Sequence, residues 1–216
     1  PWHSQCNEVQ FLHATGWQLA MPSNAEDAVG LLRTALRGND PVIFFEHRSL
    51  LDGAGARRPY PGDEFMLPFG VARCLRAGTE LTVVSWGAMV ERCELAATES
   101  GIDVELLDLR TLSPWDREAV LASVARTRRC LVVHEDNLTA GFGAEIAAVL
   151  AERATFLLAE KMGKQKAGKL VEEALAKGGS FIEALGQLEK ELSDEMALLG
   201  YSPKFVDRLL AELKRR

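Results

Sequence analysis

Short runs of apolar residues alternate with longer amphipathic stretches over most of the first 150 residues. The runs lie at residues 17–21, 42–45, 81–85, 104–108 and 130–134. In the stretches near 89–100 and 115–126, apolar residues recur every three or four positions, which is the period of a helix. Continuous apolar strands that alternate with amphipathic helices predict an α/β fold, with a doubly wound parallel sheet covered by helices on both faces.

The first 47 residues predict a right-handed strand–helix–strand unit. We expect Ser23 to cap its helix, with Glu26 three residues later completing a capping box. Gly38 to Pro41 should end this helix before the buried strand at 42–45. The buried face of the helix is expected to be Val29, Leu32 and Leu36.

Residues 48–66, rich in Gly, Arg and Pro, predict a linker, and residues 67–153 predict a second domain. Within it we expect Ser113 to begin a helix that has Pro114 at its first position. A further helix should follow Gly143, so that Gly141-Phe142-Gly143 is a turn into a helix rather than a phosphate loop.

Residues 155–216 change character, because strand patterns disappear and three helical patterns follow. These patterns predict an α-helical tail. Their apolar faces are Leu170, Val171, Ala174 and Leu175; then Phe181, Ala184, Leu185, Leu188 and Leu192; then Phe205, Val206, Leu209, Leu210 and Leu213.

Composition and charge exclude several classes of function. A net charge of −6 and the absence of a long basic block argue against nucleic acid as a partner. No apolar run reaches the roughly 18 residues that a membrane span needs. The four cysteines are far apart in sequence and lack metal-site spacing, so we expect reduced thiols and a cytoplasmic protein.

Several short motifs follow one another along the chain in a characteristic order. His3-Ser4-Gln5 opens the chain, Asp40-Pro41-Val42-Ile43-Phe44-Phe45-Glu46 follows, and Asp108-Leu109-Arg110-Thr111-Leu112-Ser113-Pro114 and His134-Glu135 come later. This order resembles the beta subunit of thiamine diphosphate-dependent 2-oxo acid dehydrogenases over residues 1–152. The resemblance implies the C-terminal part of a pyrimidine-binding domain over 1–47 and a transketolase C-terminal-like domain over 67–153.

The resemblance makes His3 the expected catalytic residue, since the histidine of the family's His-Ser-Gln motif is an active-site group. A histidine that titrates near neutrality can exchange protons with the substrate oxygen or a lipoyl sulfur. The alternative is a surface hydrogen-bonding residue. The other three histidines, His13, His47 and His134, are expected to have structural, packing or interface roles.

The resemblance also implies a potassium ion near Ala35, Leu36, Gly38 and Asp40, bound largely through backbone carbonyls. Carbonyl oxygen is a suitable ligand for a hard cation. An ordinary helix end that terminates at glycine explains the same residues equally well.

Two parts of the family's cofactor site have no counterpart in the sequence. The Gly-Asp-Gly motif, which holds the diphosphate and magnesium, belongs to the alpha partner in the family. The glutamate that contacts the aminopyrimidine ring lies upstream of the His-Ser-Gln motif, so we expect it before Pro1. The resemblance thus implies thiamine diphosphate shared with an alpha-type subunit, a lipoyl domain of an acyltransferase component as the second partner, an oligomeric enzyme, and little activity of this chain alone.

The tail resembles a different family of proteins. Residues 158–167 and the segment around Phe205 are similar to the C-terminal helices of the aspartase/fumarase lyase superfamily, although Gly168 stands where that family has histidine. Two alternatives therefore remain open: a chimera related to such lyases, or a non-catalytic assembly module whose helical tail mediates oligomerisation.

Overall fold

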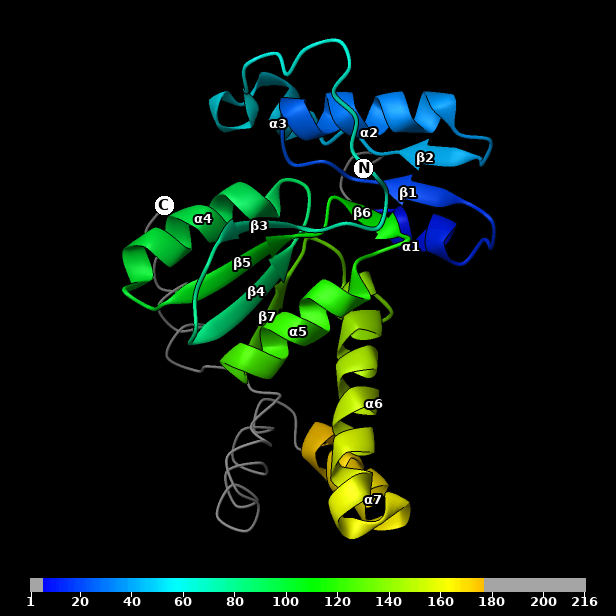
Figure 1. Cartoon of the computed structure of the whole chain (residues 1–216), viewed down its shortest axis with the longest axis vertical. Coiled ribbons are helices and arrows are strands. Elements are labelled where there is room, and N and C mark those ends of the chain that lie inside the picture. Colours follow the sequence, from blue (N-terminus) through cyan, green and yellow to red (C-terminus); the bar gives the residue numbers. More distant parts are fainter. Residues whose placement is uncertain (1–5, 177–216) are drawn as a thin grey trace.

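The computed structural model describes residues 6–176, which form two small sheets and the helices around them (Figure 1). The first sheet has the order β2 (Val42–Phe44), β1 (Gln18–Ala20), β6 (Thr111–Ser113), and the second has β3 (Arg73–Arg76), β5 (Val104–Asp108), β4 (Leu81–Ser85), β7 (Cys130–Val133). The helices are α1 (Glu8–Leu12), α2 (Ala25–Arg37), α3 (Arg48–Asp52), the 3-10 turn η1 (Ala54–Ala56), α4 (Met89–Ser100), α5 (Arg117–Thr127), α6 (Phe142–Met162) and α7 (Lys164–Ala176).

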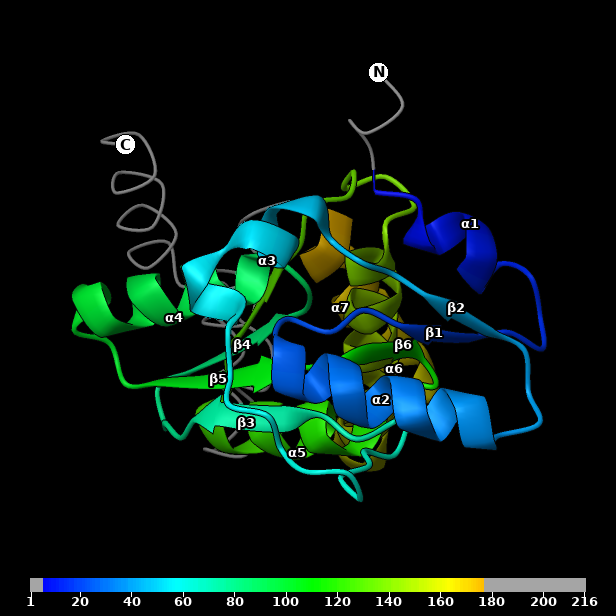
Figure 2. The same cartoon turned by 90° about the horizontal axis from the view of Figure 1, so that it is seen from above.

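The second sheet confirms the predicted α/β class. Strands β4, β5 and β7 are parallel, and α4 and α5 lie on opposite faces of the sheet (Figure 2). Side chains alternate accordingly. Leu81 and Val83 pack with Cys93 of α4, while the Thr82 hydroxyl between them hydrogen-bonds Ser123 of α5 at 2.6 Å.

The edge strand β3 was not predicted, and it pairs with β5 in the antiparallel sense. Its sequence, Arg-Cys-Leu-Arg, carries charge at both ends, and its exposure alternates along the strand. Charged side chains are usual on an edge strand, where one side stays in water. The sheet is therefore mixed, with a parallel centre and one antiparallel edge.

The strand–helix–strand unit is confirmed, since β1 and β2 are parallel neighbours joined through α2. The predicted cap is wrong. Asn24 caps α2, and its side-chain oxygen accepts the Asp27 amide at 3.0 Å. The Ser23 hydroxyl instead donates to Asp108 in the second sheet at 2.5 Å.

The predicted buried face of α2 is also wrong. Leu32 and Leu36 are 44% and 77% exposed, and the buried positions are Asp27, Gly30 and Leu31. The loop after η1 crosses α2 at Gly30, where the Leu67 amide donates to the Gly30 carbonyl at 3.2 Å. A Cβ built there would lie 2.7 Å from the Leu67 side chain, so only glycine permits this contact.

The predicted helix start at Ser113 is wrong as well. Ser113 ends β6, the Ser113–Pro114 peptide is cis, and α5 is capped by Asp116, which accepts the Ala119 amide at 3.0 Å. Strand β6 pairs with β1 in the antiparallel sense. The first sheet thus takes its third strand from the part of the chain that builds the second sheet.

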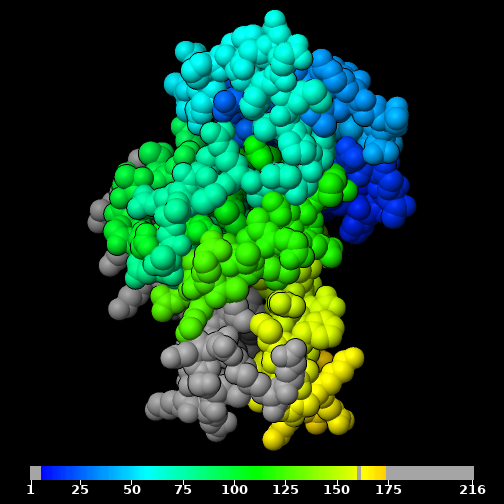
Figure 3. Space-filling model, viewed as in Figure 1, coloured from blue at the N-terminus to red at the C-terminus, as the bar shows by residue number. Residues whose placement is uncertain are grey.

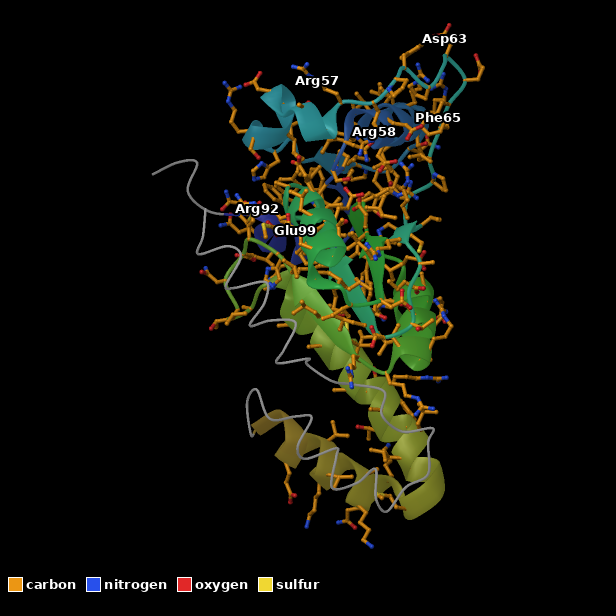
Figure 4. The ribbon with its side chains drawn as sticks, turned by 90° about the vertical axis from the view of Figure 1, so that its left-hand side faces the viewer. Arg57, Arg58, Asp63, Phe65, Arg92 and Glu99 are labelled. Atoms are coloured by element: carbon orange, nitrogen blue, oxygen red, sulfur yellow. The ribbon has the colours of Figure 1, made fainter. Side chains whose placement is uncertain are left out.

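The expected linker contains the short elements α3 and η1 and then an extended loop, whose Arg57, Arg58 and Asp63 lie on the outer side of the molecule (Figure 4). The loop is fastened to α2 by Arg33, whose guanidinium donates to the Tyr60 hydroxyl at 2.6 Å and to the Phe65 carbonyl at 3.1 Å.

Helices α6 and α7 extend from the body as an arm (Figure 3). Helix α6 runs without a break across the expected domain boundary at 153–155, and Leu150 and Leu158 belong to one apolar cluster with Ala167 and Val171 of α7. The two later tail patterns lie outside the described residues. None of the described helices is long and apolar enough to cross a membrane.

Candidate active-site region at the domain junction

Aromatic and charged side chains follow the carboxyl ends of the parallel strands. Trp86 follows β4, Arg110 lies two residues after β5, and His134 follows β7. Because β5 and β7 flank β4 on opposite sides, the chain reverses its direction of winding at the end of β4. In open α/β sheets, ligands bind at such a switch point. The strand–helix–strand unit lies over this edge (Figure 1).

The rings of Trp86 and His134 stack at the switch point, with centroids 5.3 Å apart and planes inclined by 11°. The start of α6 presses on the imidazole from the side, because a Cβ at Gly143 would lie 2.4 Å from His134 Nε2. Burial lowers the pKa of His134 below its ordinary value. The ring is therefore neutral at neutral pH and held in a fixed orientation.

His47 joins the two parts of the molecule. Its Nε2 lies 2.9 Å from the Glu135 carboxylate, and its Nδ1 lies 2.8 Å from the Ser49 hydroxyl. His47 lies three residues after the end of β2, and Glu135 lies two residues after the end of β7. This contact agrees with the packing and interface roles expected for His47 and His134-Glu135.

A buried charge network lies at the centre of the junction and was not predicted. Arg110 Nη1 is 3.3 Å from Asp27 Oδ1, and the two side chains are 7% and 1% exposed. Arg110 also donates to the Val71 carbonyl at 2.7 and 3.2 Å. Arg73 approaches the same Asp27 oxygen at 3.5 Å. No local sequence signal marks this network, because an acidic residue such as Asp27 is ordinary in the first turn of a helix.

Asp108 extends this network and is fully buried. It accepts the Ser23 hydroxyl and, at 3.0 Å, the amide of Arg110. Burial raises the pKa of Asp108 to about 7, although the two hydrogen bonds oppose the shift. The carboxyl therefore binds a proton more tightly than an exposed aspartate does.

A groove of about 880 Å³ runs beside the junction, between α1 and the first turns of α5 and α6. Its walls include His13, Trp115 and Arg117, and Arg117 pairs with Glu145 at 3.2 Å. Gly141 caps α6, so the Gly141-Phe142-Gly143 turn into a helix is confirmed.

His3 lies outside the described residues. The four residues expected to bind potassium lie at the end of α2 and just beyond it. The Ala35 carbonyl accepts the Gly38 amide at 3.2 Å, and the Asp40 carboxylate accepts Gln18 Nε2 at 3.0 Å. These contacts form an ordinary helix end. They also leave each of these oxygens a further lone pair.

A site for thiamine diphosphate would need residues beyond the described ones. The sequence has no Gly-Asp-Gly motif, and among residues 6–176 no three His, Cys, Asp or Glu side chains are arranged to hold a metal ion. The described residues therefore do not complete a site for the cofactor and its magnesium.

This arrangement defines a transketolase-like α/β protein. The chain belongs to the family described as the transketolase C-terminal domain, which it matches over residues 70–180, and residues 1–53 match the transketolase pyrimidine-binding domain. Two relatives confirm the resemblance to the beta subunits of 2-oxo acid dehydrogenases.

The chain is 43% identical over 155 residues to the mitochondrial 2-oxoisovalerate dehydrogenase subunit beta 2 of Arabidopsis thaliana, covering 70% of this chain and 43% of the relative. It is 38% identical over 159 residues to the pyruvate dehydrogenase E1 component subunit beta of Staphylococcus epidermidis, covering 72% and 48%. The chain thus spans less than half the length of these relatives.

Among solved structures, a split-gene transketolase described as an inactive beta4 tetramer matches with a TM-score of 0.53 and 24% identity. The match covers 63% of this chain and 45% of that one. It supports the fold alone.

We predict that Asp27→Ala lowers the free energy of unfolding by about 3–5 kcal/mol, because it leaves the Arg110 guanidinium buried without its carboxylate. Urea denaturation measures the change. As a control, Asp52→Ala should change it by less than about 0.5 kcal/mol, since Asp52 and Arg48 are both 84% exposed. Equal effects of the two substitutions would show that the network contributes nothing special.

A second prediction concerns pH. The pKa of Asp108 is higher in the folded chain, about 7, than its ordinary value of 3.8, so the native state binds the proton more tightly. The free energy of unfolding should therefore fall as pH rises from about 4 to about 7. Asp108→Asn should remove this part of the fall, and Asp52→Asn should not. Parallel pH profiles of urea denaturation for the parent and Asp108→Asn would contradict the prediction.

Proposed function

We propose that the chain is the beta-type portion of a 2-oxo acid dehydrogenase. The enzyme would decarboxylate a 2-oxo acid with thiamine diphosphate and transfer the acyl group to a lipoyl group. The observation that carries the proposal is the order of two family domains, pyrimidine-binding and then transketolase C-terminal, in a chain about 40% identical to beta subunits of such enzymes.

The proposal assigns proton transfer to His3. The bound cofactor would supply the carbanion chemistry, and His3 would exchange a proton at the substrate oxygen or the lipoyl sulfur. The junction would keep the two domains in a fixed relation. The pair of His47 and Glu135 links the two domains near the surface, and the pair of Asp27 and Arg110 links them in the interior.

The partners follow from the same proposal. An alpha-type subunit would bring the diphosphate and magnesium ligands, and a lipoyl domain of an acyltransferase component would receive the acyl group. The enzyme would be an oligomer in the cytoplasm or, as the name of the Arabidopsis relative indicates for that protein, in mitochondria. The names of the relatives support either pyruvate or a branched-chain 2-oxo acid as substrate.

The non-catalytic alternative is an assembly module. The catalytic component and the assembly module can be told apart in a mixture of an alpha-type subunit and a full-length beta-type subunit that contains this chain. Thiamine diphosphate is titrated into the mixture while light scattering follows the mass of the assembly. A catalytic component binds the cofactor only in the mixed assembly. A module assembles to the same mass with no cofactor uptake.

We predict that this chain alone does not decarboxylate 2-oxo acids, because loss of cofactor positioning forfeits much of the roughly 7–11 kcal/mol that orientation contributes. In the mixed assembly, His3→Ala should lower turnover about 100-fold or more, as expected for loss of a general acid–base group. His13→Gln is the matched control and should keep turnover within about threefold, since His13 is an exposed residue at the end of α1. Full turnover of His3→Ala would refute the role of His3.

The potassium site gives a separate prediction. At equal ionic strength, KCl should raise the thermal midpoint of the chain above its value in NaCl, because binding to the folded state alone stabilises it. Asp40→Ala should reduce this difference, and Asp63→Ala should not. Equal midpoints in the two salts would leave only the helix-end interpretation of Ala35, Leu36, Gly38 and Asp40.

A further inference from the structure

The edge strand β7 leaves part of its backbone without partners among the described residues. It comes last in the order β3-β5-β4-β7 and pairs there with β4 in the parallel sense. Alternate residues of a strand in a parallel pair direct their N–H and C=O groups toward the neighbouring strand. The Thr82 amide donates to the Arg129 carbonyl at 2.9 Å, so the odd-numbered positions of β7 face β4. The even-numbered Cys130 and Val132 therefore direct both of their backbone groups outward.

The chain does not cover this edge with a strand of its own between β7 and residue 176. After β7 it forms α6 and then α7, which lead away from the sheet (Figure 1). Ile146 and Leu150 of α6 belong to the apolar cluster against which Cys130 and Val132 pack, so the side chains of β7 are satisfied. The open part is backbone. An edge strand with unpaired N–H and C=O groups is a template for another strand.

Two other edge strands carry charges that work against pairing with a second copy. Strand β3 has an arginine at each end, and charged side chains protect an edge. Strand β2 is apolar, but the exposed Asp40 precedes it and the exposed Glu46 follows it. Two antiparallel copies of β2 would therefore bring acidic residues together at both ends, which is destabilising.

Strand β7 has a basic end and an acidic end instead. Arg128 and Arg129 precede it, and Glu135 and Asp136 follow it. Neither arginine forms an ion pair with another residue of 6–176. The Glu135 side chain is still 33% exposed while it pairs with His47, so a second cation can reach it. In an antiparallel pair of β7 strands, the basic end of each copy would meet the acidic end of the other.

We propose that β7 is an interface at which two copies of this chain join edge to edge about a two-fold axis. When Leu131 lies opposite its counterpart, Cys130 of each copy faces Val132 of the other. Each of these facing pairs exchanges two N–H···O bonds in an antiparallel ladder, which satisfies the outward backbone groups of both strands. Arg129 then lies diagonally across from Glu135 of the other copy, within reach of a long side chain. The two four-stranded sheets become one continuous sheet.

Sedimentation equilibrium of the 216-residue chain tests the interface directly. Each copy has a mass of 23.7 kDa, and we expect a reversible equilibrium between this mass and twice this mass. Added salt should weaken the dimer, because exposed charges contribute to its affinity. The assay contains neither cofactor nor substrate, so its outcome is independent of the proposed function. A monomer at every concentration up to about 1 mM would overturn the proposal.

Val132→Pro removes an outward N–H and keeps the ladder with β4, since proline is tolerated on an edge strand where the N–H faces away from the sheet. It should raise the Kd of the dimer about tenfold or more, because one hydrogen bond is lost from each copy. Val42→Pro on β2 is the matched control. The Gln18 amide donates to the Pro41 carbonyl at 2.9 Å, so the Val42 N–H also faces outward, and this variant should keep the Kd of the parent.

Arg129→Glu tests the charges and keeps the proposal falsifiable if Val132→Pro does not fold. It places acidic residues of the two copies together and should raise the Kd about tenfold or more. Arg57→Glu makes the same change of charge in the outer loop and should leave the Kd unchanged (Figure 4). Dissociation by Val42→Pro in place of Val132→Pro, or a parental Kd for both variants of the β7 edge, would overturn the proposal.

Discussion

The contact between Arg110 and Asp27 is the constraint on which the arrangement of the two sheets depends. A guanidinium that is 7% exposed must find acceptors inside the protein, and it finds them on both sides of the junction. Asp27 belongs to the first sheet's helix, and the Val71 carbonyl precedes the edge strand of the second. Moving either sheet by an ångström or two would strand a charge in the interior. An apolar interface would tolerate such a shift far better.

The backbone also reflects this constraint. Arg110 has a φ of 60°, a left-handed conformation that is unfavourable for a side chain with a Cβ. In that conformation its amide turns back to the Asp108 carboxylate at 3.0 Å, while its own carbonyl accepts the Met21 amide at 2.8 Å. The chain then enters β6 and pairs with β1. One strained residue thus sends the chain from the second sheet into the first, and the buried ion pair offsets the strain.

Sequence patterns succeeded where burial alone decides structure. The runs at 81–85 and 104–108 are strands with those bounds, and the helix near 89–100 is α4, because continuous apolar residues and the helical period have one low-energy interpretation in a covered sheet. The patterns failed where tertiary contacts decide. Asn24 rather than Ser23 caps α2 because the Ser23 hydroxyl has a distant partner in Asp108. No local pattern contains that contact.

The candidate site was less predictable than the fold for the same reason. His47 and Glu135 are 88 positions apart, and Asp27 and Arg110 are 83 apart, so their pairing follows from topology rather than from spacing along the chain. The resemblance to a family included the motif that begins at Asp108 but gave no sign that its carboxyl is buried.

The prediction of the buried face of α2 was wrong because two of its apolar residues are exposed. Leu32 and Leu36 follow the helical period that normally marks a buried face, yet Leu32 is 44% exposed and Leu36 is 77% exposed. The loop at Leu67 and the ion pair at Asp27 cover the adjacent face of α2 instead. Leu32 and Leu36 therefore form an apolar strip on α2 that the described residues leave largely exposed.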